Sequence, residues 1–378
     1  MPPTTNQVRA ETAGSLLRPR HLLAMRHRQR TGEASESEAR AAEDQAVLQA
    51  IELQESLGLD VITDGEMRRT SWISTVRGPL DGFDLRPGGP GWQWRGTAEA
   101  SELSTRPFPF VVRPIGIRYD LAEREYAFLH RRARVLAKYC VPAPSYHRTV
   151  WHPQQSREAY PRCEDFLVEM GDVIHRVIQD VVAMGCEYVQ LDAPNYGNLC
   201  DPSLRAAMAS TGRNLDAELE VDLALDNSVL QGVGGVTTAV HVCRGNAAGN
   251  WAASGGYGVI AERLFGDLRV DRLLLEYDTP RAGGFEALRH VRPETTVVLG
   301  LVTTKSGALE DAGAVEARIR EASAAVPLER LALSPQCCFA SVEWGNPISP
   351  AEQEAKLRLV VELARRVWPP SRLTGSAP

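Results

Sequence analysis

Eight short apolar runs with the character of β-strands recur along the chain, and longer amphipathic runs separate them. Most of the short runs are continuously apolar, as in V-V-L-G-L-V, which is typical of parallel strands buried on both faces. We predict strands at Val8–Ser15, Leu59–Thr63, Ala133–Val141, Glu187–Asp192, Val236–Cys243, Arg272–Tyr277, Thr295–Thr303 and Arg330–Ser334. Eight strand–helix units in one chain predict an α/β fold of the closed (β/α)8 TIM-barrel type.

The amphipathic runs predict the helices of the outer layer. They are expected at Glu36–Leu57, Cys163–Met184, Leu204–Leu230, Gly258–Phe265, Ala312–Ala325 and Pro350–Arg366. A doubly wound open sheet is the alternative fold. It is disfavoured because no G-x-G-x-x-G follows the first predicted strand.

One barrel is expected to occupy residues 1–370, followed by a flexible tail at 371–378. The stretch 71–132, between the second and third predicted strands, is too long for an ordinary connection. We predict that it is an insertion carrying an extra hairpin. It would form part of the pocket wall or a contact in a homo-oligomer.

Composition excludes several classes of protein. Hydrophobic content of 43% and charged content of 24% are those of a soluble globular protein, and the net charge of -6 argues against a nucleic-acid surface. No apolar run approaches the roughly 20 residues of a membrane helix, and the N-terminus has no apolar signal core. We therefore expect a cytoplasmic protein without nucleic-acid or membrane partners. Seven cysteines, an odd number, argue against a disulfide framework.

Polar residues recur where the predicted strands stop, which is where barrel enzymes carry their active residues. His241 and Cys243 are two positions apart on one strand, so both side chains point to the same face. With Glu276 and Cys337 at two further strand ends, they offer one imidazole, two thiolates and one carboxylate, a set that suits tetrahedral zinc. Alternatively, His241 is a core residue whose ring is hydrogen-bonded within the protein, and the two cysteines are buried structural thiols.

Acidic residues end two other predicted strands, in D-G-E at 64–66 and L-D-A-P at 191–194. They would recognise a cationic group or perform acid–base chemistry; alternatively they cap helices or pair with Arg68 and Arg69. Arg68 and Arg69 themselves would bind an anionic group or lie in a solvated loop. The residues alone leave these alternatives open.

Seven segments spread in order over most of the chain resemble the cobalamin-independent methionine synthase family, specifically its C-terminal catalytic barrel and its single-barrel relatives. The segments are A-G-S-L-L-R-P (13–19), G-L-D-V-I-T-D-G-E-M-R-R (58–69), V-Q-L-D-A-P (189–194), H-V-C-R-G-N (241–246), L-L-L-E-Y-D-T-P-R-A-G (273–283), V-V-L-G-L-V-T-T-K (297–305) and L-S-P-Q-C-C-F-A-S (333–341).

The resemblance implies zinc-dependent transfer of an alkyl group to a thiol. The zinc ligands it implies are His241, Cys243, Glu276 and Cys337, of which His241, Cys243 and Cys337 are also the expected catalytic residues. The residues it implies for the amino-acid part of homocysteine are Ser15, Glu66 and Asp192. Two departures stand out: the family's C-G pair is Cys337–Cys338 here, which leaves Cys338 as an alternative ligand, and its D-E-P is D-A-P.

We therefore predict an enzyme that activates a small-molecule thiol as a zinc thiolate for attack on an alkyl carbon, with methyl transfer to homocysteine or a related thiol as the leading case. The donor, whether a folate, a corrinoid protein or an epoxide, stays open. One alternative is epoxide opening of the epoxyalkane:coenzyme M transferase type, with Tyr196 or His147 as proton donor. Others are a metal-free lyase resembling uroporphyrinogen decarboxylase and a zinc-holding scaffold protein.

Overall fold

A curled parallel sheet forms the centre of the computed structural model, which describes residues 8–87, 89, 93–97, 100–118 and 122–369. Its seven strands run in the order β1-β4-β5-β6-β7-β8-β9, each parallel to its neighbour. Their bounds are β1 (Val61–Ile62), β4 (Leu136–Pro142), β5 (Tyr188–Asp192), β6 (Thr237–Val242), β7 (Arg272–Glu276), β8 (Thr296–Val302) and β9 (Leu331–Pro335). Every residue of these strands is buried, as the continuous apolar runs predicted.

The first predicted strand, Val8–Ser15, is reduced to two isolated parallel bridges. Ala10 bridges Leu333 of β9, and Glu11 bridges Val61 of β1. These two residues therefore occupy the eighth position and join the two edge strands. The predicted TIM-barrel class is confirmed. The structure differs from the prediction at the first strand, because neither of its bridges extends to a second consecutive pair of residues.

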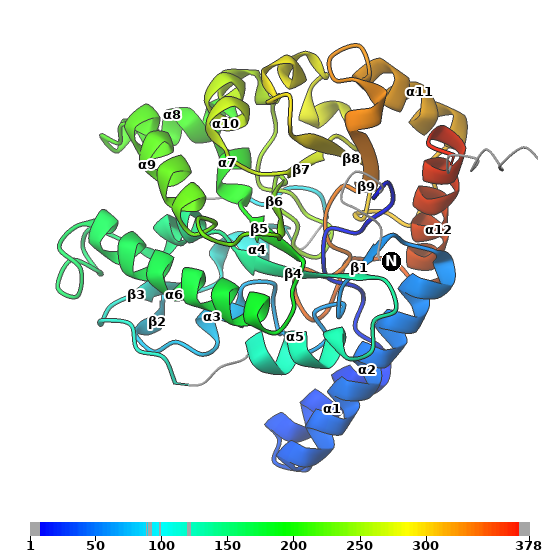
Figure 1. The fold of residues 1–378 in the computed structure, drawn as a ribbon. Helices are drawn as coiled ribbons and strands as arrows, with labels where there is room; N and C mark the ends of the chain where they lie inside the picture. Colours follow the sequence, from blue (N-terminus) through cyan, green and yellow to red (C-terminus); the bar gives the residue numbers. More distant parts are fainter. Residues whose placement is uncertain (1–7, 88, 90–92, 98–99, 119–121, 370–378) are drawn as a thin grey trace, which may run out of the picture.

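Helices surround the sheet (Figure 1). Those of the outer layer are α1 (Arg20–Arg30), α2 (Glu36–Leu57), α5 (Ala122–His130), α6 (Cys163–Ala183), α8 (Pro202–Ser210), α9 (Leu215–Ser228), α10 (Ala261–Asp267), α11 (Ala312–Ala322) and α12 (Pro350–Val367). Shorter turns of helix follow several strands, namely α3 (Ser74–Arg77), α4 (Ala100–Thr105), α7 (Pro194–Asn198), η2 (Pro144–Val150), η3 (Tyr257–Val259), η4 (Pro280–Ala282), η5 (Glu286–His290) and η6 (Leu328–Arg330). None of the described helices is long and apolar enough to cross a membrane.

Helix boundaries follow local capping chemistry. The predicted bounds of α2 are confirmed: Ser35 and Glu38 form a capping box, and Gly58 ends the helix in a left-handed conformation with φ 83°. The prediction of one helix over Leu204–Leu230 is wrong, because the chain forms two helices there. Gly212 adopts φ 84° between them, and Asn214 caps α9 by accepting a hydrogen bond from the backbone amide of Ala217.

The segment 71–132 holds α3, α4, α5 and an antiparallel pair, β2 (Phe83–Arg86) with β3 (Phe108–Val111). The pair lies beside α6 (Figure 1), and Phe83 contacts Phe166 of that helix at 6.3 Å between ring centroids. The last helix, α5, packs against α6 and β4. That the segment is an insertion within a single domain stays a prediction, and the predicted tail 371–378 lies outside the described residues.

Candidate active site

Three of the four predicted metal ligands meet at the carboxyl ends of β6 and β9. His241 is the second-last residue of β6, Cys243 directly follows that strand, and Cys337 lies just beyond β9. One ligand atom from each of the three lies within 4.8 Å of the others, and all three residues are buried. The spacing of two on β6 therefore places both side chains on the interior face, as the alternation of a strand requires.

The imidazole of His241 is oriented for a metal. Its Nδ1 lies 3.2 Å from the carbonyl oxygen of Leu274, while its Nε2 is buried and has no hydrogen-bond partner among the described residues. Burial lowers the pKa of His241, which favours the neutral ring. A proton on Nδ1 would be donated to the carbonyl and would leave the lone pair of Nε2 free, which is the usual arrangement of a metal-binding histidine. One imidazole and two thiols fit zinc.

Glu276, the fourth predicted ligand, ends β7 and is fully buried, but it lies outside this three-residue group. Its Oε2 accepts a hydrogen bond from the backbone amide of Arg244 at 2.8 Å, and its Oε1 accepts one from Arg281 at 2.5 Å. Burial alone would raise the pKa of Glu276, but Lys305, Arg244 and Arg281 outweigh it and lower the pKa to about 2. The carboxylate is therefore ionised and already paired.

The two adjacent cysteines after β9 have different surroundings. Cys337 belongs to the group with His241 and Cys243, whereas the sulfur of Cys338 accepts the backbone N–H of Ser15 at 3.4 Å. A hydrogen bond with Cys243, together with burial, raises the pKa of Cys337 well above that of a free thiol. Geometry thus favours Cys337 over Cys338 as the ligand.

A second buried group lies beside the first and contains two of the three predicted substrate-binding residues. Glu66, Cys140 and Asp192 each place one atom within 4.8 Å of the others. Gly14 connects this group to Ser15 and Cys338: a Cβ on Gly14 would stand 3.1 Å from Glu66 Oε1 and 3.4 Å from the Cys338 sulfur. Only glycine leaves this approach open.

Glu66 is the most unusual residue of this second group. Its backbone has φ 55°, which non-glycine residues rarely adopt, and its amide donates to Asp64 Oδ1 at 2.8 Å. Neither carboxylate oxygen accepts a hydrogen bond among the described residues, although Arg69 Nη1 lies 3.2 Å from Oε1. Burial raises the pKa of Glu66 to about 8, and Arg69 offsets this only in part. Such an unsatisfied carboxylate suits a cationic ligand.

Ser15 and Asp192 complete the predicted substrate set. The hydroxyl of Ser15 is buried and without a hydrogen-bond partner among the described residues. Asp192 accepts a hydrogen bond from Gln190 Nε2 at 2.7 Å, and burial raises its pKa. The structure therefore places Ser15, Glu66 and Asp192 around the same region next to the candidate metal ligands.

Four other residues were candidates for anion binding or proton donation, and the structure gives most of them other partners. Arg69 forms an ion pair with Glu125 at 2.9 Å and Arg68 one with Asp44 at 2.6 Å, so each guanidinium already has an acidic partner. The hydroxyl of Tyr196 donates to Asp226 at 2.6 Å. His147 is fully buried with Nε2 unpaired, and burial lowers its pKa to about 3.

Several residues that shape the site escaped the sequence analysis. Cys140 was not proposed because a thiol in an apolar strand has no distinguishing pattern. Lys138 offered a signal, since a lysine in the buried run A-K-Y-C-V needs partners. It donates to Gln190 Oε1 at 2.7 Å, and Gln190 in turn holds Asp192. A turn separates Arg281 from Glu276, and the sequence does not reveal the geometry of that turn.

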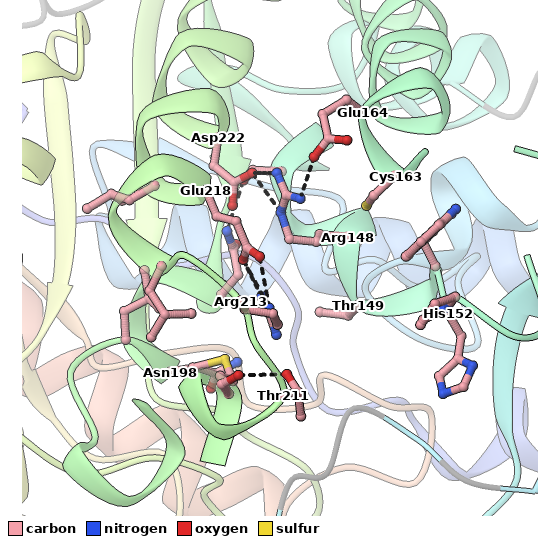
Figure 2. A pocket seen from close by; sticks show the side chains of 18 of the residues that line it. Arg148, Thr149, His152, Cys163, Glu164, Asn198, Thr211, Arg213, Glu218 and Asp222 are labelled. Atoms are coloured by element: carbon pink, nitrogen blue, oxygen red, sulfur yellow. Dashed lines mark hydrogen bonds and ion pairs between the residues drawn. The ribbon is translucent and has the colours of Figure 1, made fainter. Parts of the chain in front are cut away.

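A cavity of about 880 Å³ opens beside the ends of β4 and β5. Its lining includes Ser145 and Asn195 together with residues of η2, α6, α8 and α9. Figure 2 shows Arg148 between Asp222 and Glu164, and Arg213 beside Glu218. The cavity therefore combines an apolar wall with arginines that already have acidic partners.

Comparison with known proteins identifies the family. The family model described as the cobalamin-independent synthase, catalytic domain, matches residues 10–366. The chain belongs to the cobalamin-independent synthase family. The resemblance inferred from the seven segments is thereby confirmed, and the chain is an enzyme of the methionine synthase-like class.

Individual relatives agree with the family assignment. The chain is 34% identical over 365 residues to the uncharacterised protein YxjH of Bacillus subtilis (strain 168), covering 95% of this chain and 94% of the relative. It is 23% identical over 327 residues to the methionine synthase of Pyrococcus abyssi (strain GE5 / Orsay), covering 86% and 84%. The crystal structure of a putative vitamin-B12 independent methionine synthase from Listeria monocytogenes matches with a TM-score of 0.72 at 30% identity, covering 95% and 97%.

Proposed function

We propose that this enzyme is a zinc-dependent methyltransferase that transfers a methyl group to the thiol of an amino acid of the homocysteine type. One observation carries the proposal: the buried, unpartnered Nε2 of His241 lies with the thiols of Cys243 and Cys337 in a single compact group. The methionine synthase of Pyrococcus abyssi, a relative over most of the chain, supports the reaction class.

Zinc would be held by His241, Cys243 and Cys337, with Glu276 as an exchangeable fourth partner. A bound zinc ion supplies one effect, because it lowers the pKa of a coordinated substrate thiol so that the sulfur is nucleophilic near neutral pH. The protein supplies orientation and a dry environment. The residues of both groups are buried, so a bound substrate exchanges water for fixed protein dipoles.

An amino-acid thiol fits the second group better than an anionic thiol such as coenzyme M. The ammonium of such a substrate would donate hydrogen bonds to the Glu66 carboxylate, whose two oxygens accept none among the described residues, with Asp192 and the Ser15 hydroxyl nearby. Arg68 and Arg69, the cations predicted for an anionic thiol, are already paired with Asp44 and Glu125. Epoxide opening would also need a proton donor, and the Tyr196 hydroxyl is bound to Asp226.

The methyl donor would enter through the cavity between η2 and α9. Ser145 and Asn195 in its lining follow the ends of β4 and β5, and β5 lies next to β6, the strand that carries His241. Its arginines Arg148 and Arg213 are already paired with acids, so the lining provides no surplus positive charge for a polyanionic tail. A donor without such a tail therefore suits it. Family membership also speaks against the metal-free lyase alternative.

The test is the zinc content of the purified protein and its response to thiols. The wild type should bind about one zinc ion per chain, and His241→Ala and Cys337→Ser should lose it. Cys163→Ser, a buried thiol on α6 outside the group, is the matched control and should retain the metal. In cobalt-substituted protein, homocysteine should generate a cobalt–thiolate band.

Two outcomes would contradict the proposal. Wild type without zinc, or zinc retained equally by His241→Ala, would remove the thiol-activation mechanism. A band that grows with coenzyme M and not with homocysteine would replace the amino-acid thiol by an anionic one and favour the epoxide reaction.

A further inference from the structure

Arg281 makes the shortest contact to the buried carboxylate of Glu276. It lies on the short turn η4 after β7, and its Nη2 is 2.5 Å from Glu276 Oε1 and 3.5 Å from Asp278 Oδ1. The Glu276 side chain has no solvent exposure, and that of Arg281 is 13% exposed. An ion pair in such a setting is little screened by solvent, so Arg281 is a strong partner for this oxygen.

The two oxygens of Glu276 are held in different ways. Oε2 accepts from the backbone amide of Arg244 at 2.8 Å and lies 3.4 Å from Gln336 Nε2. That amide is fixed, because the Arg244 guanidinium is anchored on the carbonyl of Gly255 and stacks on Tyr257. Oε1 is held by a side chain that can move, so the pairing with Arg281 is the part of this arrangement that can exchange.

Arg281 is held in position by Trp251, which in turn pairs with the segment 71–132. Its guanidinium lies over the ring of Trp251 at 4.8 Å. The backbone of Trp251 exchanges two hydrogen bonds with that of Arg95, at 2.8 and 2.9 Å, and Arg95 belongs to the segment 71–132. Two residues beyond Cys243, a Cβ on Gly245 would lie 3.1 Å from the neighbouring Trp94 ring. The segment 71–132 thus contacts Trp251, on which Arg281 stacks, and the loop that follows Cys243.

We propose that Arg281 is a positioning residue that competes with the metal for Glu276 and so keeps the fourth coordination position available to the substrate thiol. The inference rests on the proposed function. The ion pair with Arg281 stabilises Glu276 in a position outside the three-residue ligand group, so the strength of this ion pair sets how readily Glu276 closes the metal site. Trp251 and Arg95 hold Arg281 in the place from which it competes.

The first experiment measures zinc affinity of the full-length protein against a chromophoric chelator. Arg281→Met should tighten zinc binding about tenfold, which corresponds to the loss of one charge-assisted hydrogen bond to the competing partner. Arg281→Lys, which keeps the charge, should stay near the wild type. Arg263→Met removes an exposed arginine that pairs with Asp267 on α10 and is the matched control.

A double-substitution comparison separates positioning from a general structural effect. In a Glu276→Gln background, Arg281→Met should leave zinc affinity unchanged, because no carboxylate remains to be released. Equal or weaker zinc binding by Arg281→Met in the wild-type background would overturn the proposal, as would the same gain in both backgrounds. Arg281→Gln, checked by circular dichroism, provides a second variant with the same expectation if Arg281→Met does not fold.

The second experiment titrates cobalt-substituted protein with homocysteine and follows the cobalt–thiolate band. Arg281→Met should require several-fold more thiol than the wild type, because Glu276 then occupies the position that the thiol needs. Unchanged titration would overturn the proposal. The experiment distinguishes failure of this proposal from failure of the proposed function. A wild type that binds no zinc would contradict both. A wild type that binds zinc and thiol, with an Arg281→Met variant that behaves in the same way, would contradict only the role of Arg281.

Discussion

At the scale of single residues, the site is defined by buried polar atoms that have no hydrogen-bond partner among the described residues. His241 Nε2, the Ser15 hydroxyl and both carboxylate oxygens of Glu66 are such atoms. An unsatisfied buried polar group costs free energy, so a cluster of them indicates a place where a ligand completes the interactions. Glu66 adds backbone strain at φ 55°, which is found where surrounding structure enforces a functional position.

The Glu66 carboxyl should make the stability of the metal-free protein depend on pH. Burial raises its pKa to about 8, so its contribution to stability is fully present below the usual glutamate pKa and is lost as the pH rises through about 8. Glu66→Gln does not titrate. Relative to wild type, its free energy of unfolding should therefore increase by about 4 kcal/mol between about pH 5 and pH 9.

Urea unfolding at the two pH values measures this difference. Glu36→Gln, at an exposed position on α2, should show the same pH dependence as the wild type. If the curves of Glu66→Gln and wild type ran parallel across the range, the carboxyl would not carry the raised pKa.

At the scale of elements, one short helix holds the end of β6 in place. Helix α7 follows β5, and its Gly197 lies so close to Cys243 that a Cβ there would stand 1.9 Å from the Cys243 carbonyl oxygen. The interior spacing of His241 and Cys243 follows from strand alternation and was predictable. The close packing of α7 on this strand end was not, because a glycine in P-N-Y-G-N carries no signal of what it contacts.

Gly197→Ala should therefore displace α7 from β6 and disturb the candidate metal ligands. We expect a loss of about 2 kcal/mol of unfolding free energy or more, as for other overpacked sites, together with weaker zinc binding. Thermal unfolding and zinc content measure the two effects. Gly234→Ala, with open space around the position of its Cβ, is the matched control. Unaltered zinc content in Gly197→Ala would show that the end of β6 tolerates movement of α7.

At the scale of the whole molecule, a buried ionic cluster stands where the barrel closes. Glu11, which bridges to β1, pairs with Lys138 of β4 at 2.8 Å and with Arg272 of β7 at 2.9 Å, and none of the three side chains is exposed. Lys138 also donates a hydrogen bond to Gln190, and Gln190 donates one to Asp192. The closure of the barrel and the candidate substrate site are thus connected through its interior.

Glu11→Gln should destabilise the protein strongly, because it leaves two buried cations without their carboxylate. The expected loss is about 3 to 5 kcal/mol of unfolding free energy, measured by urea denaturation. The exposed substitution Glu36→Gln should change stability by less than about 0.5 kcal/mol. A loss for Glu11→Gln as small as that of Glu36→Gln would mean that water or another acid compensates the cluster.

Sequence by itself determined the alternation of strands and helices, the bounds of α2 and the family, and it singled out His241, Cys243 and Cys337, which the structure brings together. Strand periodicity, capping residues and side-chain chemistry are local properties, so the sequence alone reveals them. Only the tertiary structure decided that Glu276 is paired with Arg281, that the Cys338 sulfur accepts a hydrogen bond from the Ser15 amide, and that the Glu66 carboxylate accepts no hydrogen bond among the described residues. Those facts depend on distances between segments far apart in the chain, and burial and ion pairing arise only when the barrel brings them together.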